Sequence, residues 1–186
     1  MYWDKPGKQN TENTLEVVKK AVKERGIKHV VVASSEGYTA RLFRDANLGA
    51  NLVVVTHACG FEAPGEMQFP EELRRELISS GAKVLTATHV LSGVERGISR
   101  KFGGAYPAEI MANTLRMFGQ GTKVCVEIAI MALDAGLIPY GQDVIAVGGS
   151  SEGADTAVII RPSHAASAFD TWISEILCKP AYNYKN

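Results

Sequence analysis

A six-residue segment, Ser34 to Thr39, has the composition of a loop that binds a phosphate group. Serine and threonine side chains supply hydroxyl donors, and Gly37 allows the backbone to approach a ligand closely. The segment separates a β-branched run from a helical pattern, so free N–H groups at the helix start would face the phosphate. The alternative is that Ser35 or Thr39 only caps the helix. The predicted phosphate-binding residues are Ser34, Ser35, Gly37, Tyr38 and Thr39.

Polar or small residues also follow the other segments that we expect to be strands. Thr56-His57 follows the second strand, Thr88-His89 the third, and Gly148-Gly149 the fourth. Ligands of open parallel sheets bind beyond the carboxyl ends of the strands, where these residues would meet. The predicted ligand site therefore also includes Thr56, His57, Thr88, His89, Ser92, Gly93 and Gly149.

His57 and His89 are the candidates for acid–base chemistry at this edge. They lie about thirty residues apart, as equivalent positions of a βαβ repeat would. A histidine titrates near neutral pH, so either could act as a general acid, bind a ligand or serve a structural role. A metal site with Cys59 is an alternative that no short-spaced ligand motif supports, and we predict no metal. The catalytic residues, if any, stay undefined.

The elements that must position these residues follow from hydrophobic patterns. Short β-branched runs predict buried strands, and periodic apolar residues between stop signals predict helices. The expected strands are 29–33, 52–55, 83–87, 143–147 and 157–160, of which the last two can form a hairpin. The expected helices are 11–25, 39–46, 70–80, 107–118, 123–135 and 169–177. This order predicts an α/β fold of three layers, α/β/α, around a mainly parallel sheet.

Two further features lie near the predicted edge. Glu127 interrupts an apolar helix, and we interpret it as a side chain that reaches solvent rather than a buried acid that faces the site. The tetrapeptide Ser-Ser-Glu-Gly of the first loop recurs at Ser150–Gly153, without a following helix. It reads as a chance repeat of turn residues or as a mobile loop that closes over a ligand.

Composition excludes several classes of function. The chain has 186 residues, of which 46% are hydrophobic, and its 20 basic and 20 acidic residues give no net charge. We therefore expect one domain over residues 1–186 with no nucleic-acid partner. No apolar run is long enough to span a bilayer, and the three scattered cysteines fit a reducing compartment, so we expect a cytoplasmic protein without a membrane partner. Apolar helices and Trp172 make a homo-oligomer an open expectation.

The residues resemble a known family. Val30–Ala40 and Ala50–Thr56 are similar to the carboxyl-terminal domain of pyruvate kinases, in which a Ser/Thr-rich loop binds the phosphate of a sugar-phosphate effector. The later segments Ala135–Ile138, Gly141–Val147 and Thr156–Val158 resemble the end of the same domain. The resemblance lapses over residues 57–121, which would be an insertion. The catalytic barrel of pyruvate kinase is not present, so the resemblance implies no kinase activity.

The whole sequence also resembles a small, mostly prokaryotic group of stand-alone proteins that are similar to this domain and have no assigned activity. Lys5-Pro6-Gly7, Thr88-His89 and Ser92–Arg96 carry this resemblance. It implies flavin mononucleotide (FMN) as the ligand, with its phosphate in the first loop, and hence a flavoprotein with a possible redox activity. The alternatives are a non-catalytic sensor of a phosphorylated metabolite such as a sugar phosphate, and a phosphoesterase that uses His57 or His89.

Overall fold

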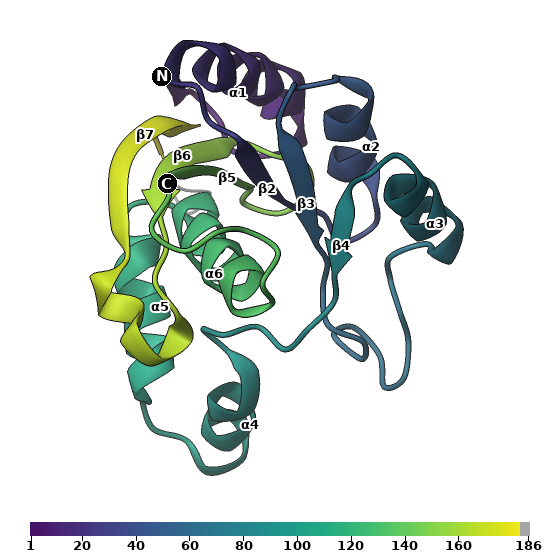
Figure 1. The fold of residues 1–186 in the computed structure, drawn as a ribbon. Helices are drawn as coiled ribbons and strands as arrows, with labels where there is room; N and C mark the ends of the chain where they lie inside the picture. The colour runs from purple at the N-terminus through teal and green to yellow at the C-terminus, as the bar shows by residue number, and fades with distance from the viewer. Residues whose placement is uncertain (183–186) are drawn as a thin grey trace.

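The computed structural model describes residues 1–182 and contains one sheet whose strands follow the order β1-β7-β6-β5-β2-β3-β4 (Figure 1). Residues 183–186 of the predicted domain lie outside the described part. The strands are β1 (Tyr2–Trp3), β2 (His29–Ala33), β3 (Asn51–Val55), β4 (Lys83–Leu85), β5 (Val144–Gly148), β6 (Thr156–Arg161) and β7 (Trp172–Pro180). The α-helices are α1 (Thr11–Arg25), α2 (Tyr38–Asp45), α3 (Glu71–Ser79), α4 (Gly93–Phe102), α5 (Pro107–Arg116) and α6 (Gln120–Asp134). Short 3₁₀ turns cover Lys8–Asn10 and Ala165–Asp170.

The centre of the sheet is parallel, as the β-branched runs predict. β2 pairs with β3 from His29↔Asn51 to Ala33↔Val55, and it pairs with β5 on its other side. β4 extends the parallel part beyond β3. The valines of β2 and β3 are almost completely buried because helices cover both faces of the sheet. All four strands therefore present their carboxyl ends at one edge.

Helices form a layer on each face of the sheet. Alternate residues of β2 show this, because Val30 and Val32 pack with α1, α2 and α3 whereas Val31 packs with α6. α6 is buried along most of its length and contacts β2, β3, β5 and β6. This arrangement confirms the predicted three-layer α/β fold with a central apolar helix (Figure 1).

The end of the chain confirms one prediction and corrects another. β6 runs antiparallel to β5, as expected for a hairpin, with the register Val144↔Ile160 to Gly148↔Thr156. The helix predicted over 169–177 is wrong, because most of this segment forms β7, which pairs antiparallel with β6. Two register shifts in that pairing break the polar–apolar alternation expected of a strand, so the apolar residues take a helix-like spacing.

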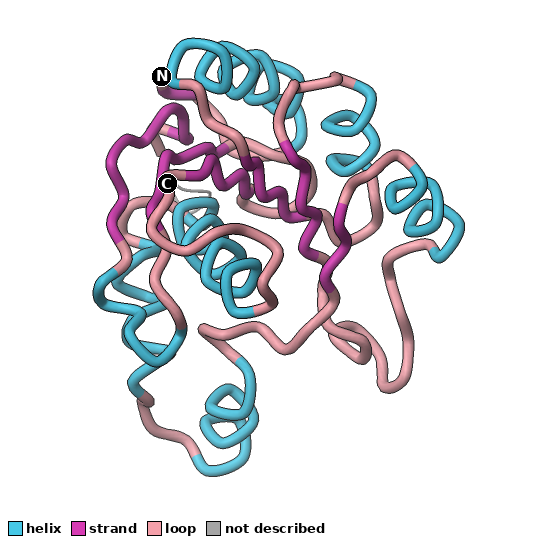
Figure 2. The backbone as a smooth tube through the Cα atoms, viewed as in Figure 1, coloured by secondary structure: helices cyan, strands magenta, loops and turns pink. Residues whose placement is uncertain are grey.

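Long loops follow the carboxyl ends of β3 and β4 (Figure 2). The first contains residues 56–70 and leads to α3, and the second contains residues 86–92 and leads to α4. The segment between this second loop and α5 is mostly helical, because it contains α4. Among residues 1–182, no helix has the length and hydropathy needed to cross a membrane.

Candidate functional site

A pocket of about 430 Å³ lies at the carboxyl edge of the parallel strands. It collects residues from the loops after β2, β3, β4 and β5 and from helices α5 and α6. The predicted residues that line it are Ser34, Ser35, Tyr38, Thr39, Thr56, His57, His89, Ser92 and Gly149. Gly37, Thr88 and Gly93 do not line it, and Thr88 is exposed.

The loop between β2 and α2 forms one wall of the pocket. Gly37 immediately precedes α2 with φ 99°, a backbone conformation that favours glycine, and a Cβ atom there would lie 2.2 Å from Leu73 Cδ2. Ser34 Oγ accepts a hydrogen bond of 3.2 Å from the Ala40 N–H, so Ser34, rather than Ser35 or Thr39, satisfies a donor of the helix start. Tyr38 and Thr39, the first residues of α2, line the pocket beside Ser35, so the start of this helix lies next to the pocket.

His57 and His89 lie side by side in the pocket, with ring centroids 5.6 Å apart. Phe61 stacks on His57 at 3.9 Å and lies 5.3 Å from His89, so three rings form one surface. His57 Nδ1 bonds with Gln68 Oε1 at 2.6 Å, which fixes the orientation of that imidazole. Burial lowers the pKa of His89, and the charges of His57 and Lys123 act in the same direction, against Glu127. His89 is therefore a neutral imidazole near pH 7.

The sequence reasoning missed the polar group behind this ring surface. The hydroxyl groups of Thr56 and Thr86 are 2.6 Å apart, and Arg74 Nη2 donates to Thr86 Oγ1 at 2.6 Å. Thr86 was expected inside the third strand, but β4 ends one residue earlier, which leaves its side chain free to join β3 to α3. The signal in the sequence was a threonine directly after the apolar residues of two strands, Thr56 after Leu52–Val55 and Thr86 after Val84-Leu85.

The structure corrects the sequence interpretation of Glu127, because this side chain is buried rather than directed to solvent. Only 4% of Glu127 and 5% of Lys123 are exposed, and the two side chains form an ion pair on α6. Glu127 also accepts a hydrogen bond of 3.0 Å from the Leu91 N–H. Burial lowers the pKa of Lys123, the charges of Arg116 and Arg96 add to that effect, and Glu127 opposes it. The pair thus links α6 to the loop that carries His89.

Two arginines also line the pocket and were not predicted. Arg96 comes from α4 and Arg116 from the end of α5. Arg116 donates to the side-chain oxygens of Gln120 at 2.7 Å and Asn113 at 2.9 Å. Within residues 1–182 the Arg96 guanidinium takes part in no ion pair. Basic residues on helices are common, so nothing in the sequence marked these two.

The Ser150–Gly153 loop lines the pocket opposite Tyr38 and is tied to the amino-terminal segment. Fully buried Asp155 accepts hydrogen bonds from the N–H groups of Gly7 at 2.9 Å and Ser150 at 3.1 Å. Lys8 forms an ion pair with Glu152 at 3.2 Å, and its Nζ lies 4.5 Å from the centre of the Tyr38 ring. Lys8 therefore connects the two loops that share the Ser-Ser-Glu-Gly sequence.

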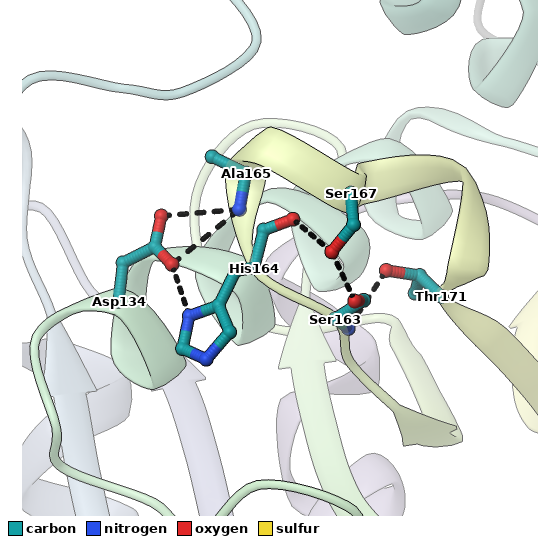
Figure 3. A network of polar contacts seen from close by, with 6 residues as sticks. All are labelled: Asp134, Ser163, His164, Ala165, Ser167 and Thr171. Carbon is teal, nitrogen blue, oxygen red and sulfur yellow. Dashed lines mark hydrogen bonds and ion pairs between the residues drawn. The ribbon is translucent and has the colours of Figure 1, made fainter.

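A second polar cluster lies at the carboxyl end of α6, where Asp134 is the last helical residue. It contains serine, histidine and aspartate side chains but lacks the geometry of a Ser-His-Asp triad (Figure 3). His164 Nδ1 bonds with Asp134 Oδ1 at 2.7 Å. The hydroxyl groups of Ser163 and Ser167 bond with each other at 2.6 Å, and Ser167 also donates to the His164 carbonyl. Figure 3 shows the imidazole turned toward Asp134 and away from both serines. In a catalytic triad the imidazole would instead bond with a serine hydroxyl, so the hydrogen bonds of this cluster only stabilise a turn.

None of the three cysteines lines the pocket. Cys125 and Cys178 are completely buried, and burial raises the pKa of both thiols, that of Cys178 to about 11. Cys59 is exposed and does not line the pocket. Within the described residues, no three His, Cys, Asp or Glu side chains gather as a metal centre would require.

The family model of the pyruvate kinase alpha/beta domain matches residues 12–160. The chain belongs to this family. Among solved structures it is similar to a pyruvate kinase from Cryptosporidium parvum, with 18% identity and a TM-score of 0.43 over 81% of this chain and 22% of that one. Two further structures of pyruvate kinase from this organism, one in complex with ADP, have 17% and 16% identity and TM-scores of 0.39 and 0.40. They cover 77% and 91% of this chain and 21% and 24% of the kinases.

The chain thus spans less than a quarter of the length of these kinases. The residues matched by the family model contain β2, β3, β4 and β5 and all of β6 except its last residue, Arg161.

Proposed function

We propose that the pocket at the carboxyl edge binds a small molecule that carries a phosphate group, with FMN as the first candidate. The arrangement of the β2–α2 loop is the observation that carries this proposal. Ser35 and Thr39, which bracket the start of α2, line one wall of the pocket, and Gly37 shapes the turn between them without lining it. Free N–H groups and a helix dipole together form a favourable environment for an anion.

The remaining walls suit the ring system of FMN. The volume of about 430 Å³ lies in the range of small-molecule and cofactor sites, roughly 300–1,000 Å³. His57, Phe61 and His89 offer a surface of rings, and Ile128 and Met131 add apolar contacts from α6. A bound flavin would supply hydride or single-electron transfer. His57 and His89 would then be the side chains that exchange protons with a bound molecule.

A comparison of FMN with riboflavin, which lacks the phosphate, tests this proposal. We expect FMN to bind at least ~10-fold more tightly than riboflavin, because hydrogen bonds to a charged group contribute about 1.5–3 kcal/mol each. Ser35→Ala and Thr39→Val should weaken FMN binding and leave riboflavin binding unchanged in a fluorescence-quenching titration. Thr114→Val, an exposed residue of α5 outside the pocket, is the matched control. Equal binding of the two flavins, or no quenching at all, would rule FMN out.

A non-catalytic sensor of a phosphorylated metabolite is the second candidate. The connection of the Ser150–Gly153 loop to the amino-terminal segment favours it, because a ligand that moves this loop would act on Lys8 and on Asp155. We expect glucose 6-phosphate, but not glucose, to raise the melting temperature without being consumed. Release of inorganic phosphate during the assay would instead indicate a hydrolase.

A further inference from the structure

We propose that Arg96, Arg116 and Lys123 form a second anion site in the pocket, which binds the carboxylate group of a phosphorylated metabolite, the second candidate above, because FMN has no carboxylate. Each of these residues comes from a different helix, α4, α5 and α6 respectively, and all three line the pocket. α6 lies on the face of the sheet opposite to α2, so this basic wall is separate from the phosphate loop. The pocket therefore has an anion-binding group at each side of the ring surface.

The hydrogen bonds of this wall leave capacity for a ligand. Among residues 1–182, the Arg116 guanidinium donates hydrogen bonds only to the neutral side-chain oxygens of Gln120 and Asn113. Arg96 forms no ion pair in the part of the chain that the structure describes. A guanidinium group that lacks an acidic partner can bind a carboxylate through two parallel hydrogen bonds.

The charge of the wall matches a carboxylate better than a phosphate. The acidic side chains on this side are Glu127, which pairs with Lys123, and Glu109, which accepts a hydrogen bond of 2.7 Å from Ser99 Oγ. Three basic and two acidic side chains give a net charge of +1. A single carboxylate neutralises this charge, whereas a phosphate dianion would exceed it.

Lys123 supplies independent support for an anion at this wall. Burial lowers its pKa, Glu127 opposes that effect, and the positive charges of Arg116 and Arg96 add to it, so both guanidinium groups repel the Lys123 ammonium. A carboxylate placed among them would relieve that repulsion. The inference rests on the proposed function only for the position of the phosphate. The basic wall itself is defined by Arg96, Arg116 and Lys123, whose places in the pocket do not depend on where a phosphate binds.

Three related sugar derivatives distinguish binding at the phosphate site from binding at the carboxylate site. 6-Phosphogluconate carries a phosphate and a carboxylate, glucose 6-phosphate only the phosphate, and gluconate only the carboxylate. Binding to the full chain, freed of any bound small molecule, is measured by calorimetry in phosphate-free buffer at constant ionic strength. We expect 6-phosphogluconate to bind ~10-fold more tightly than glucose 6-phosphate. Arg96→Gln and Arg116→Gln should remove this difference without weakening glucose 6-phosphate, whereas Arg100→Gln, on the exposed side of α4, should keep it.

The outcomes distinguish failure of this inference from failure of the proposed function. Equal binding of the two phosphates, both weakened by Ser35→Ala, would overturn the carboxylate site and leave the phosphate site standing. Binding of gluconate as tight as that of 6-phosphogluconate, with no effect of Ser35→Ala, would keep the carboxylate site and overturn the phosphate site. No binding of 6-phosphogluconate, or tighter binding of glucose 1,6-bisphosphate, would also overturn the inference.

Discussion

Lys123 and Glu127 are charged residues in the buried and mainly apolar part of α6. Burying a charge is unfavourable, and here each member of the pair compensates the other. Glu127 has a second task, because it accepts the Leu91 N–H of a loop that lies 36 positions earlier in the chain. The pair therefore contributes both to stability and to the position of the loop after β4.

Removal of one member of this pair should lower the free energy of unfolding far more than replacement of both members. We expect Lys123→Met or Glu127→Gln to lower the free energy of unfolding by about 3–5 kcal/mol, because a buried charge loses its partner. The double variant Lys123→Met/Glu127→Gln keeps an acceptor for the Leu91 N–H and should lose much less. Urea denaturation of the four proteins measures the cycle. Additive losses would show that the two charges do not compensate each other.

The burial of Glu127 was beyond prediction from the sequence for a physical reason. The residue type and its helical position favour solvent, and the two groups that hold it inside are a lysine one turn away and a distant loop N–H. Only the folded chain brings the loop to α6. The loop residues Ser34, Ser35 and Thr39 were predictable, in contrast, because the neighbouring strand and helix place them locally.

At the scale of elements, the β2–α2 turn positions the loop that we propose as the phosphate site. Gly37 adopts a positive φ and packs against Leu73 of α3, so this turn needs both the backbone freedom and the small size of glycine. Gly26, which ends α1 with φ 64°, needs only the backbone freedom, because nothing lies within 4 Å of a Cβ atom there. The two glycines thus form a natural pair for comparison.

Gly37→Ala should therefore destabilise the protein more than Gly26→Ala. A left-handed conformation costs a non-glycine residue about 1–2 kcal/mol, and this cost applies to both variants. Gly37→Ala also forces Leu73 to move and should weaken binding of a phosphate-bearing ligand. Thermal denaturation and ligand titration of the two variants provide the measurement. Equal losses of stability would show that Leu73 adapts without cost.

Elements with strong local patterns were predictable, and β7 was not. The buried strands of the parallel centre are runs of β-branched residues, and α6 combines length with apolar composition. β7 depends on pairing with β6, including two register shifts that no local pattern reveals. Arg96 and Arg116 also escaped prediction, since their approach to the pocket depends on how α4 and α5 pack.

At the scale of the whole molecule, two histidines connect stability with pH. Burial lowers the pKa of His29, with a further contribution from Lys83, and burial is also the main cause of the lowered pKa of His89. His29 Nδ1 is buried without a hydrogen-bond partner in the described structure. Below the ordinary histidine pKa of about 6.5, the unfolded chain therefore binds more protons than the folded chain.

The free energy of unfolding should accordingly decrease as the pH falls through about 6.5. Urea denaturation at a series of pH values between about 7.5 and 5.5 measures this decrease. His29→Gln should reduce the dependence on pH, and a second substitution, His89→Gln, should reduce it further. If the free energy of unfolding decreased equally in the wild type and the double variant, the dependence on pH would come from groups other than these two histidines.

The intrinsic fluorescence of Trp3 offers a way to follow ligand binding. Its indole N–H donates to the Asp155 carbonyl at 2.7 Å, directly behind the Ser150–Gly153 loop, whereas the other tryptophan, Trp172, is largely exposed. A ligand that draws this loop toward the β2–α2 turn would change the surroundings of the Trp3 indole. Emission that remains after an added quencher has suppressed Trp172 would then follow the occupancy of the pocket in real time, without a label.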